Sequence, residues 1–331
     1  MGSVYLKLGA AVLALAAGAS GIVVAVLLLR SVPGPVSTAS VTQSSGGAST
    51  TAASSIEGGR IATPTQPGFP SPPPGAVVMA QEAGNDGLGV AFAPASGGTL
   101  VRASVIGPDN PVRGLHVTLA AGSATGRVAA ACGPGCYQTT FATLPPAGHL
   151  VVSLDAKHYV FPLPGPTTGG SGIVTHAERT WKALKTLVWR ERLASSSTEV
   201  LYTVYKVVAP DRLAYSIKGA SESIIIGNER WDRSTPTSGW VESVQNPALD
   251  LPVPFWVDQA DTNVIGTGRF RGRPVWHVTF FDPRTPGWFS AEIDRQNYRT
   301  LELDMIAAAH FMHHVYGPFD APIKIEPPAS A

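Results

Sequence analysis

Three side chains near the C-terminus carry donor atoms that suit a metal ion. His310, Met312 and His314 occupy alternate positions of a predicted strand, and alternate strand residues share one face. Imidazole and thioether groups together favour copper over magnesium or calcium. Neighbours in this set lie about 6.6 Å apart and can converge on one ion, whereas the two histidines lie about 13 Å apart. A copper site here needs a further ligand from another strand or a partner protein. The alternative is that all three are solvated strand residues without a ligand.

The stretch that carries these residues, 301–316, is expected to form one long strand. Its odd positions make an almost unbroken apolar face, which is typical of a core or a cavity wall. We predict that Ala307, Ala309 and Phe311 line a cavity for an apolar ligand. His313 falls on this face and is therefore excluded from the metal set. The even face is expected to lie on an exposed or interdomain surface.

The sequence favours a binding protein over an enzyme. It contains no Gly-x-Ser-x-Gly nucleophile elbow and no His-Glu-x-x-His zinc motif. Gly266, Gly268 and Gly272 lack the spacing of a phosphate-binding loop, and no helix is expected after them. No catalytic residue is assigned.

Composition narrows the class of protein further. With 24 Lys+Arg against 23 Asp+Glu, the net charge of +1 gives no field that attracts nucleic acid. The 35 glycines and 29 prolines indicate many short strands joined by turns, and 44% hydrophobic residues are ample for real cores. The 331-residue chain is therefore expected to be mainly β (α+β), with more than one domain.

The N-terminal part is expected to anchor the chain in a membrane. Residues 8–29 are uncharged and lie between Lys7 and Arg30, and about 20 apolar residues suffice to cross a bilayer as a helix. We therefore predict a transmembrane anchor over 1–30, with a cleaved signal peptide as the alternative. Residues 31–72, rich in Ser, Thr, Gly and Pro, are expected to be a disordered linker. The chain is then a single-pass cell-membrane protein whose bulk is extracytoplasmic.

Residues 73–164 are expected to form a small β-sandwich. Short β-type runs alternate there with Gly-rich and Pro-rich turns. The two cysteines of the chain, Cys132 and Cys136, flank a Gly-Pro-Gly turn that can bring the sulfurs together. We predict a disulfide, which suits an extracytoplasmic location, with free thiols as the alternative.

This segment resembles a domain of bacterial copper-resistance proteins. Residues 73–78, the turn at 107–109 and the hairpin at 132–137 are similar to the immunoglobulin-like extracytoplasmic domain of the CopC/CopD group and of YtkA-like proteins. Some actinobacterial CopD-like proteins end in a span, a proline-rich tether and this sandwich, although their multi-span body has no counterpart here. The resemblance implies copper as a ligand and a CopD-type membrane protein as a partner.

Residues 173–328 are expected to pack one helix against a long antiparallel sheet. Thr175 and Glu178 have capping-box spacing, and the helix that follows should bury Ala177 and Trp181. The strand pattern then continues to residue 316, broken by the Pro-rich stretch 246–256, which should lie as a loop over an opening. For Phe255 and Trp256 we predict a role in capping a cavity, with core packing as the alternative for the tryptophans in general.

A second resemblance covers this C-terminal region. Residues 208–212, 227–232, 288 with 293–294, and 316 with 319–323 are similar to the LolA/LppX-type lipoprotein-carrier superfamily. The resemblance implies a curved half-barrel that holds acyl chains or another apolar ligand, with Arg212 as the positional candidate for the arginine that gates the cavity. The function expected is thus a membrane-anchored extracytoplasmic binding protein for a lipid. A copper-binding accessory module and a ligand-free envelope interaction domain are the alternatives.

Overall fold

The computed structural model describes residues 71–107, 112–196, 199–284, 287–307 and 310–329. The predicted anchor and almost all of the predicted linker lie outside these residues. Within the described residues, no helix has both the length and the apolar character needed to cross a membrane. Residues 65–331 make one compact unit.

The N-terminal strands form two antiparallel sheets around a common core. One sheet has the order β1-β2-β3-β7-β6 and the other β5-β4-β8-β9. Met79, Leu88, Val101, Leu119 and Leu150 are among the buried side chains that meet between them. The strands are β1 (Val77–Ala83), β2 (Asp86–Ala95), β3 (Gly98–Ile106), β4 (Val117–Ala121), β5 (Arg127–Val128), β6 (Ala130–Gly133), β7 (Cys136–Phe141), β8 (His149–Leu154) and β9 (Lys157–Pro162).

The predicted disulfide between Cys132 and Cys136 is present. It closes the turn between β6 and β7, where Gly133 and Gly135 both take the positive φ angles that glycine tolerates best. The disulfide therefore fixes the end of one hairpin.

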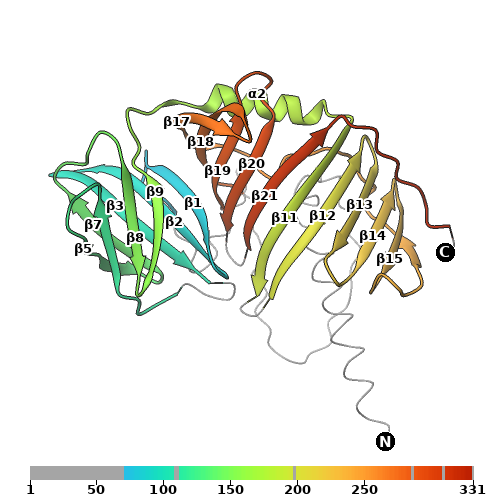
Figure 1. Ribbon diagram of the computed structural model, residues 1–331, viewed down its shortest axis with the longest axis horizontal. Coiled ribbons are helices and arrows are strands. Elements are labelled where there is room, and N and C mark those ends of the chain that lie inside the picture. The colour runs from blue at the N-terminus through green and yellow to red at the C-terminus, as the bar shows by residue number, and fades with distance from the viewer. Residues whose placement is uncertain (1–70, 108–111, 197–198, 285–286, 308–309, 330–331) are drawn as a thin grey trace, which may run out of the picture. The chain divides into compact units, whose positions relative to one another are not determined.

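The C-terminal strands form a single open sheet, which we call the half-barrel (Figure 1). Its order is β10-β17-β18-β19-β20-β21-β11-β12-β13-β14-β15-β16, and every paired neighbour is antiparallel. Two meanders, β11 to β16 and β17 to β21, join only through the pairing of β11 with β21. The strands are β10 (Thr168–Gly169), β11 (Thr186–Ser196), β12 (Glu199–Val208), β13 (Arg212–Ile217), β14 (Glu222–Ile226), β15 (Glu229–Arg233), β16 (Val241–Val244), β17 (Ala260–Phe270), β18 (Arg273–Asp282), β19 (Gly287–Asp294), β20 (Thr300–Ala307) and β21 (His310–Phe319).

The helix α2 (Ser171–Lys182) begins earlier than the capping-box spacing predicts. Gly170 is the N-cap residue and makes no side-chain cap, so Thr175 lies within the helix and the capping-box prediction is wrong. The helix ends at Lys182, and β11 begins at Thr186. Ala177 and Trp181 are buried as predicted, and α2 crosses the upper ends of the half-barrel strands (Figure 1).

The prediction of one strand over 301–316 is also wrong. β20 ends at Ala307 and β21 begins at His310, and the two pair antiparallel with Met305 opposite Met312. Reversal of the chain changes which residues share a face, because directly opposed residues point the same way. Leu303, Met305, Met312 and His314 therefore lie on one face of the half-barrel, and Ile306 lies with Phe311 on the other.

The face that carries Ile306 and Phe311, here the outer face, packs against the sandwich. Trp288, Ile306 and Phe311 are almost completely buried there. The sandwich presents small residues to them from β1, from the residue before it and from β2: Ala76, Val78, Ala80, Ala91 and Ala93. The five-stranded sheet is thus buried on both sides, because its larger residues, such as Leu88 and Val90, face the sandwich core. The two sheets of the sandwich and the sheet of the half-barrel are therefore stacked as three layers, with the five-stranded sheet in the middle.

Two glycines of β2 allow the sheets to approach this closely. A Cβ atom on Gly89 would lie 2.5 Å from Cε3 of Trp288, and one on Gly87 would collide with the ring of Phe311. Real Cβ atoms do not approach neighbours that closely. Each site therefore requires glycine for a steric reason, not for an unusual backbone conformation.

We predict that Gly89→Ala destabilises the protein by about 1–3 kcal/mol, because the added methyl group overpacks a filled interface. The control is Gly172→Ala in α2, where nothing lies within 4 Å of the added Cβ. That control should be neutral or stabilising, since alanine is the better helix former. Urea unfolding of both variants measures the difference, and equal stabilities would contradict the steric account.

Polar contacts border the same interface. The Arg192 side chain forms an ion pair with Glu82 and donates from Nη2 to the carbonyl oxygen of Gly84 at 2.7 Å. His313 lies beside them, with Nδ1 2.9 Å from Oδ1 of Asp304 and Nε2 3.4 Å from Oε1 of Glu302. The hydrogen bond to Asp304 raises the pKa of His313, and burial raises the pKa values of Glu82 and Glu302.

These pKa shifts all have the same consequence for stability. A group whose pKa is raised by folding binds its proton more tightly in the folded protein, so its contribution is present at low pH and declines as pH rises through the folded pKa. We predict that stability falls between pH 6 and pH 8 through His313, and that His313→Gln removes part of this fall. Denaturation at both pH values tests it, with the exposed His149→Gln as control. An unchanged pH dependence in His313→Gln would refute the prediction.

Candidate ligand-binding site

A buried ionisable pair lies on the inner face of the half-barrel, where β11 meets β21. Glu191 and His314 are directly opposed in the strand register, and Oε2 of Glu191 lies 2.7 Å from Nε2 of His314. Glu191 is 5% exposed and His314 is fully buried. Because Nε2 faces a carboxylate, this nitrogen carries a proton and donates it.

Two tyrosines complete the hydrogen bonding of this pair. The Tyr205 hydroxyl donates to Oε1 of Glu191 at 3.1 Å, and the Tyr316 hydroxyl lies 2.7 Å from Nδ1 of His314. Burial raises the pKa of each phenol well above its usual value of 10. Both phenols therefore keep their protons at neutral pH. With the proton of His314 on Nε2, the Tyr316 hydroxyl donates to Nδ1.

The polar contacts continue along the inner face towards β15. The Tyr205 and Tyr215 rings are 5.6 Å apart, and the Tyr215 hydroxyl accepts from Nη2 of Arg230 at 3.1 Å. Arg230 also donates to both carboxylate oxygens of Asp232, at 2.6 and 2.8 Å. We call this set of seven residues the polar band: Glu191, Tyr205, Tyr215, Arg230, Asp232, His314 and Tyr316.

Aromatic side chains cover the polar band. The Trp189 ring stacks on Tyr205 at 4.4 Å, and the Phe255 ring meets the His314 ring edge-on at 4.5 Å. Trp181 of α2 contacts Tyr316 at 4.8 Å and Trp256 at 6.2 Å between ring centroids. The cover of the inner face thus consists of α2 together with the Pro-rich segment that contains Phe255 and Trp256.

Three indole N–H groups in this aromatic layer have no acceptor. Nε1 of Trp181, Trp189 and Trp256 is buried without a hydrogen-bond partner, and each side chain is at least nine-tenths buried. Burying an unpaired donor is unfavourable by about 1–3 kcal/mol. The inner face therefore holds hydrogen-bonding capacity that the chain itself does not use.

The Pro-rich segment is fastened at both ends. At one end, the amides of Leu249 and Leu251 donate to the carbonyl oxygens of Gly227 and Pro210. At the other end, Oδ2 of the buried Asp282 accepts from the amides of Val257 at 2.7 Å and Asp258 at 3.3 Å. These bonds hold Phe255 and Trp256, which lie between them, over the inner face.

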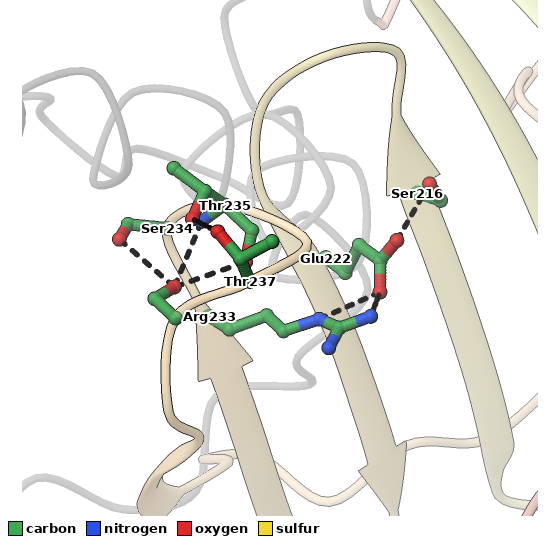
Figure 2. A network of polar contacts seen from close by, with 7 residues as sticks. Ser216, Glu222, Arg233, Ser234, Thr235 and Thr237 are labelled. Carbon is green, nitrogen blue, oxygen red and sulfur yellow. Dashed lines mark hydrogen bonds and ion pairs between the residues drawn. The ribbon is translucent and has the colours of Figure 1, made fainter.

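A second polar network lies on the opposite face of the half-barrel and is distinct from the polar band. Figure 2 shows Arg233 paired with Glu222, which also accepts from Ser216 at 3.3 Å. The serine and threonine hydroxyls of residues 234–238 bond among themselves beside it. Arg233 also lies over the Trp240 ring. These half-buried contacts stabilise a turn and present no unused group.

The structure separates the residues predicted to line the cavity. Phe311 packs against the sandwich on the outer face and so does not line the inner face. Ala307 has the same parity in β20 as the inward Met305 and also contacts the edge of the packing with the sandwich, and its role in lining a cavity stays a prediction. Ala309 lies outside the described residues. Phe255 and Trp256 lie over the inner face. Arg212 donates from Nη1 to the carbonyl oxygen of Ile325 at 2.7 Å and so holds the C-terminal segment.

The predicted metal ligands do not gather into a metal centre within the described residues. Met312 and His314 share a face, but it is the buried inner face and not the exposed or interdomain surface that we predicted. Both ring nitrogens of His314 already have partners. No group of three or more His, Cys, Asp or Glu side chains among the described residues could hold a metal ion. Copper binding stays a prediction.

Glu191 is the central one of the polar-band residues that the sequence analysis missed, the others being Tyr205, Tyr215, Arg230 and Asp232. It lies in Leu187-Val188-Trp189-Arg190-Glu191-Arg192-Leu193, where the odd positions are Leu, Trp, Glu and Leu. A charged residue at an inward position of an apolar face indicates a buried pair. The flanking arginines conceal this signal, because the three charges together look like an exposed stretch.

Comparison with known proteins gives a distant likeness. Neither a protein family nor a curated protein matches the sequence. The lipoprotein LppX of Mycobacterium tuberculosis is 8% identical and covers 47% of this chain and 97% of its own, with a TM-score of 0.35. LprF of Mycobacterium bovis is 9% identical over 49% of this chain and 97% of its own, with a TM-score of 0.36. A LolA superfamily protein of Nitrosomonas europaea is 8% identical to this chain. The match covers 47% of this chain and 95% of that protein, with a TM-score of 0.24. Likenesses at these scores carry no argument about what this chain binds.

We predict that Glu191→Ala destabilises the protein by about 1–3 kcal/mol, because it leaves buried donors of His314 and Tyr205 without an acceptor. Glu178→Ala is the control, since Glu178 forms an i,i+4 pair with Lys182 at the surface of α2. That control should cost less than about 0.5 kcal/mol. Denaturant unfolding measures both, and a Glu191→Ala variant as stable as the control would show that the buried pair contributes nothing.

Proposed function

We propose that this chain is an extracytoplasmic binding protein that holds an apolar ligand, such as a lipid, between the inner face of the half-barrel and its cover. The predicted membrane span at 8–29 would keep it at the cell membrane. The observation that carries the proposal is the aromatic layer of the inner face, with its three indole donors that lack an acceptor. A ligand with apolar surface and a few acceptor oxygens matches that layer.

The construction of the cover supports this proposal. The segment between Leu251 and Val257 contains neither helix nor strand and is fastened through hydrogen bonds at its ends. Gln259 links it to α2 by donating to the Thr175 hydroxyl at 3.1 Å. A cover of this kind can lift from the sheet without breaking any strand pairing, so the half-barrel keeps its structure when a ligand enters.

The chemistry of the polar band also favours binding over catalysis. Its hydroxyl groups are phenols whose pKa values burial has raised, so they act as hydrogen-bond donors and are poor nucleophiles. The band suits the recognition of a polar group at one end of an otherwise apolar molecule.

The test is to purify the full chain natively and to analyse it for lipid by mass spectrometry and for metal by elemental analysis. We expect about one lipid per protein, and strong loss of it in Trp256→Ala, because that variant opens the aromatic cover. Trp240→Ala is the matched control, since Trp240 lies under Arg233 away from the inner face. Protein without lipid would refute the proposal, and stoichiometric copper without lipid would favour the copper-binding alternative.

A further inference from the structure

We propose that the turn between β17 and β18 docks on the surface of an anionic phospholipid bilayer. This turn has the sequence Arg269-Phe270-Arg271-Gly272-Arg273, and we call it the arginine hairpin. None of its residues belongs to the polar band or to the cover of the inner face. The proposal therefore goes beyond the proposed function and does not depend on any ligand held there.

The backbone gives the arginine hairpin a short and defined tip. Phe270 is paired with Arg273, so only Arg271 and Gly272 form the loop. Both have positive φ angles, of 48° and 81°, as in a type I′ turn. Arg269 closes the tip by donating from Nη1 to the carbonyl oxygen of Gly272 at 2.7 Å. Asparagine or glycine suits the first loop position best, so the turn itself does not need the Arg271 side chain.

One arginine fixes the arginine hairpin to the sheet. Nε of Arg273 lies 2.5 Å from Oδ2 of Asp294, which is completely buried. The carboxylates farther along the neighbouring strands β19 and β20, those of Glu292 and Glu302, have histidine partners. The acidic groups around the arginine hairpin are thus already paired.

Three other arginines at this end of the half-barrel have no carboxylate partner. Arg269, Arg271 and Arg295 are exposed, and none of them forms an ion pair within the described residues. Arg295 lies at the base of the arginine hairpin, because its amide donates to the carbonyl oxygen of Pro274 at 2.9 Å. Their three positive charges are therefore available to an anionic partner.

Aromatic rings hold two of these guanidinium groups. Arg271 lies over the Phe270 ring at 5.2 Å, and Arg295 lies over the Trp276 ring at 5.7 Å. The Trp276 ring in turn lies 5.2 Å from the Tyr298 ring. A guanidinium that stacks on a ring keeps its N–H edge free, and that edge binds phosphate in a bidentate manner. Arginine beside half-buried aromatic rings suits the headgroup region of a bilayer, where apolar and charged groups meet.

A bilayer fits this surface better than a folded protein does. The centre of a protein interface is apolar, whereas the most exposed large apolar side chains of the described residues lie elsewhere, in β5, β9, β12 and β16. An anionic bilayer instead presents many phosphate groups in one plane. A projecting two-residue loop can reach that plane with several arginines at once, and each adds electrostatic attraction.

The test uses the full-length chain with an environment-sensitive fluorophore on Gln296→Cys, an exposed position next to Arg295. The native cysteines are joined in a disulfide, so the fluorophore attaches to the new thiol alone. The vesicles contain brominated phosphatidylcholine, either pure or mixed with an equal part of phosphatidylglycerol, and bromine quenches the fluorophore on contact. We expect quenching in the mixed vesicles that falls with added salt, and little in the neutral ones. Quenching reports contact of the arginine hairpin whether or not the predicted span at 8–29 enters the vesicle.

The hairpin variant combines Arg269→Gln with Arg271→Asn. Asparagine is favoured at the first loop position, so this variant should fold as stably as the parent protein. The ratio of quenched to unquenched fluorophore should fall at least about tenfold, because each arginine near an anionic bilayer contributes a factor of about five. The matched control combines Arg190→Gln with Lys206→Gln, which removes two exposed charges from β11 and β12. The control should leave quenching unchanged.

Two results would overturn the proposal: equal quenching in neutral and mixed vesicles, or equal quenching in the hairpin variant and the parent protein. An acidic protein that co-purifies with the parent chain but not with the hairpin variant, without quenching in mixed vesicles, would also overturn it and favour a protein partner. None of these results changes what the inner face retains, so failure here is distinguishable from failure of the proposed function.

Discussion

The half-barrel buries both of its faces over β18 to β21, and the rest of the structure is arranged around that requirement. A sheet that is apolar on two sides needs a partner on each, since exposed apolar area of this size is unfavourable in water. The sandwich supplies one partner through a surface of alanine and glycine, which lets the bulky Trp288, Ile306 and Phe311 insert from the other side. The aromatic cover supplies the other. For this reason β18 to β21 carry large apolar side chains on both faces of the sheet.

The two coverings differ in kind, and this difference locates the site. The outer contact is built from fully packed apolar side chains; besides its border, its polar groups are the indole N–H of Trp288 and the Ser290 hydroxyl, which accepts from the Ala80 amide. The inner contact contains ionisable residues, phenols and indole donors beneath a segment without regular structure. A close-packed layer on the outer side fixes the strands of the sheet.

Much of the architecture could be predicted from the sequence, whereas the composition of the site could not. Antiparallel strands with one packed helix, the Cys132–Cys136 bridge and the irregular segment before Trp256 follow from local patterns. The reversal between Ala307 and His310 does not, because the apolar alternation runs through it unbroken. The wrong face assigned to Phe311 follows from that one error. Between Gly87 and Ala93 glycine or alanine alternates with a larger apolar residue, and no position is polar. This pattern indicates a strand that is buried on both faces.

The pairing of β11 with β21 also determines the order in which the chain can fold. These strands lie more than one hundred residues apart, as the separation of 123 between Glu191 and His314 shows. As the chain emerges from the ribosome, the meander from β11 to β16 can form early, but its β11 edge stays unpaired until β21 has been made. Long-range pairing of this type slows folding and leaves an adhesive strand edge in the interim. Glu191 at that edge places a charge on the inward side of the waiting strand, a feature that discourages pairing with foreign strands until its own partner arrives.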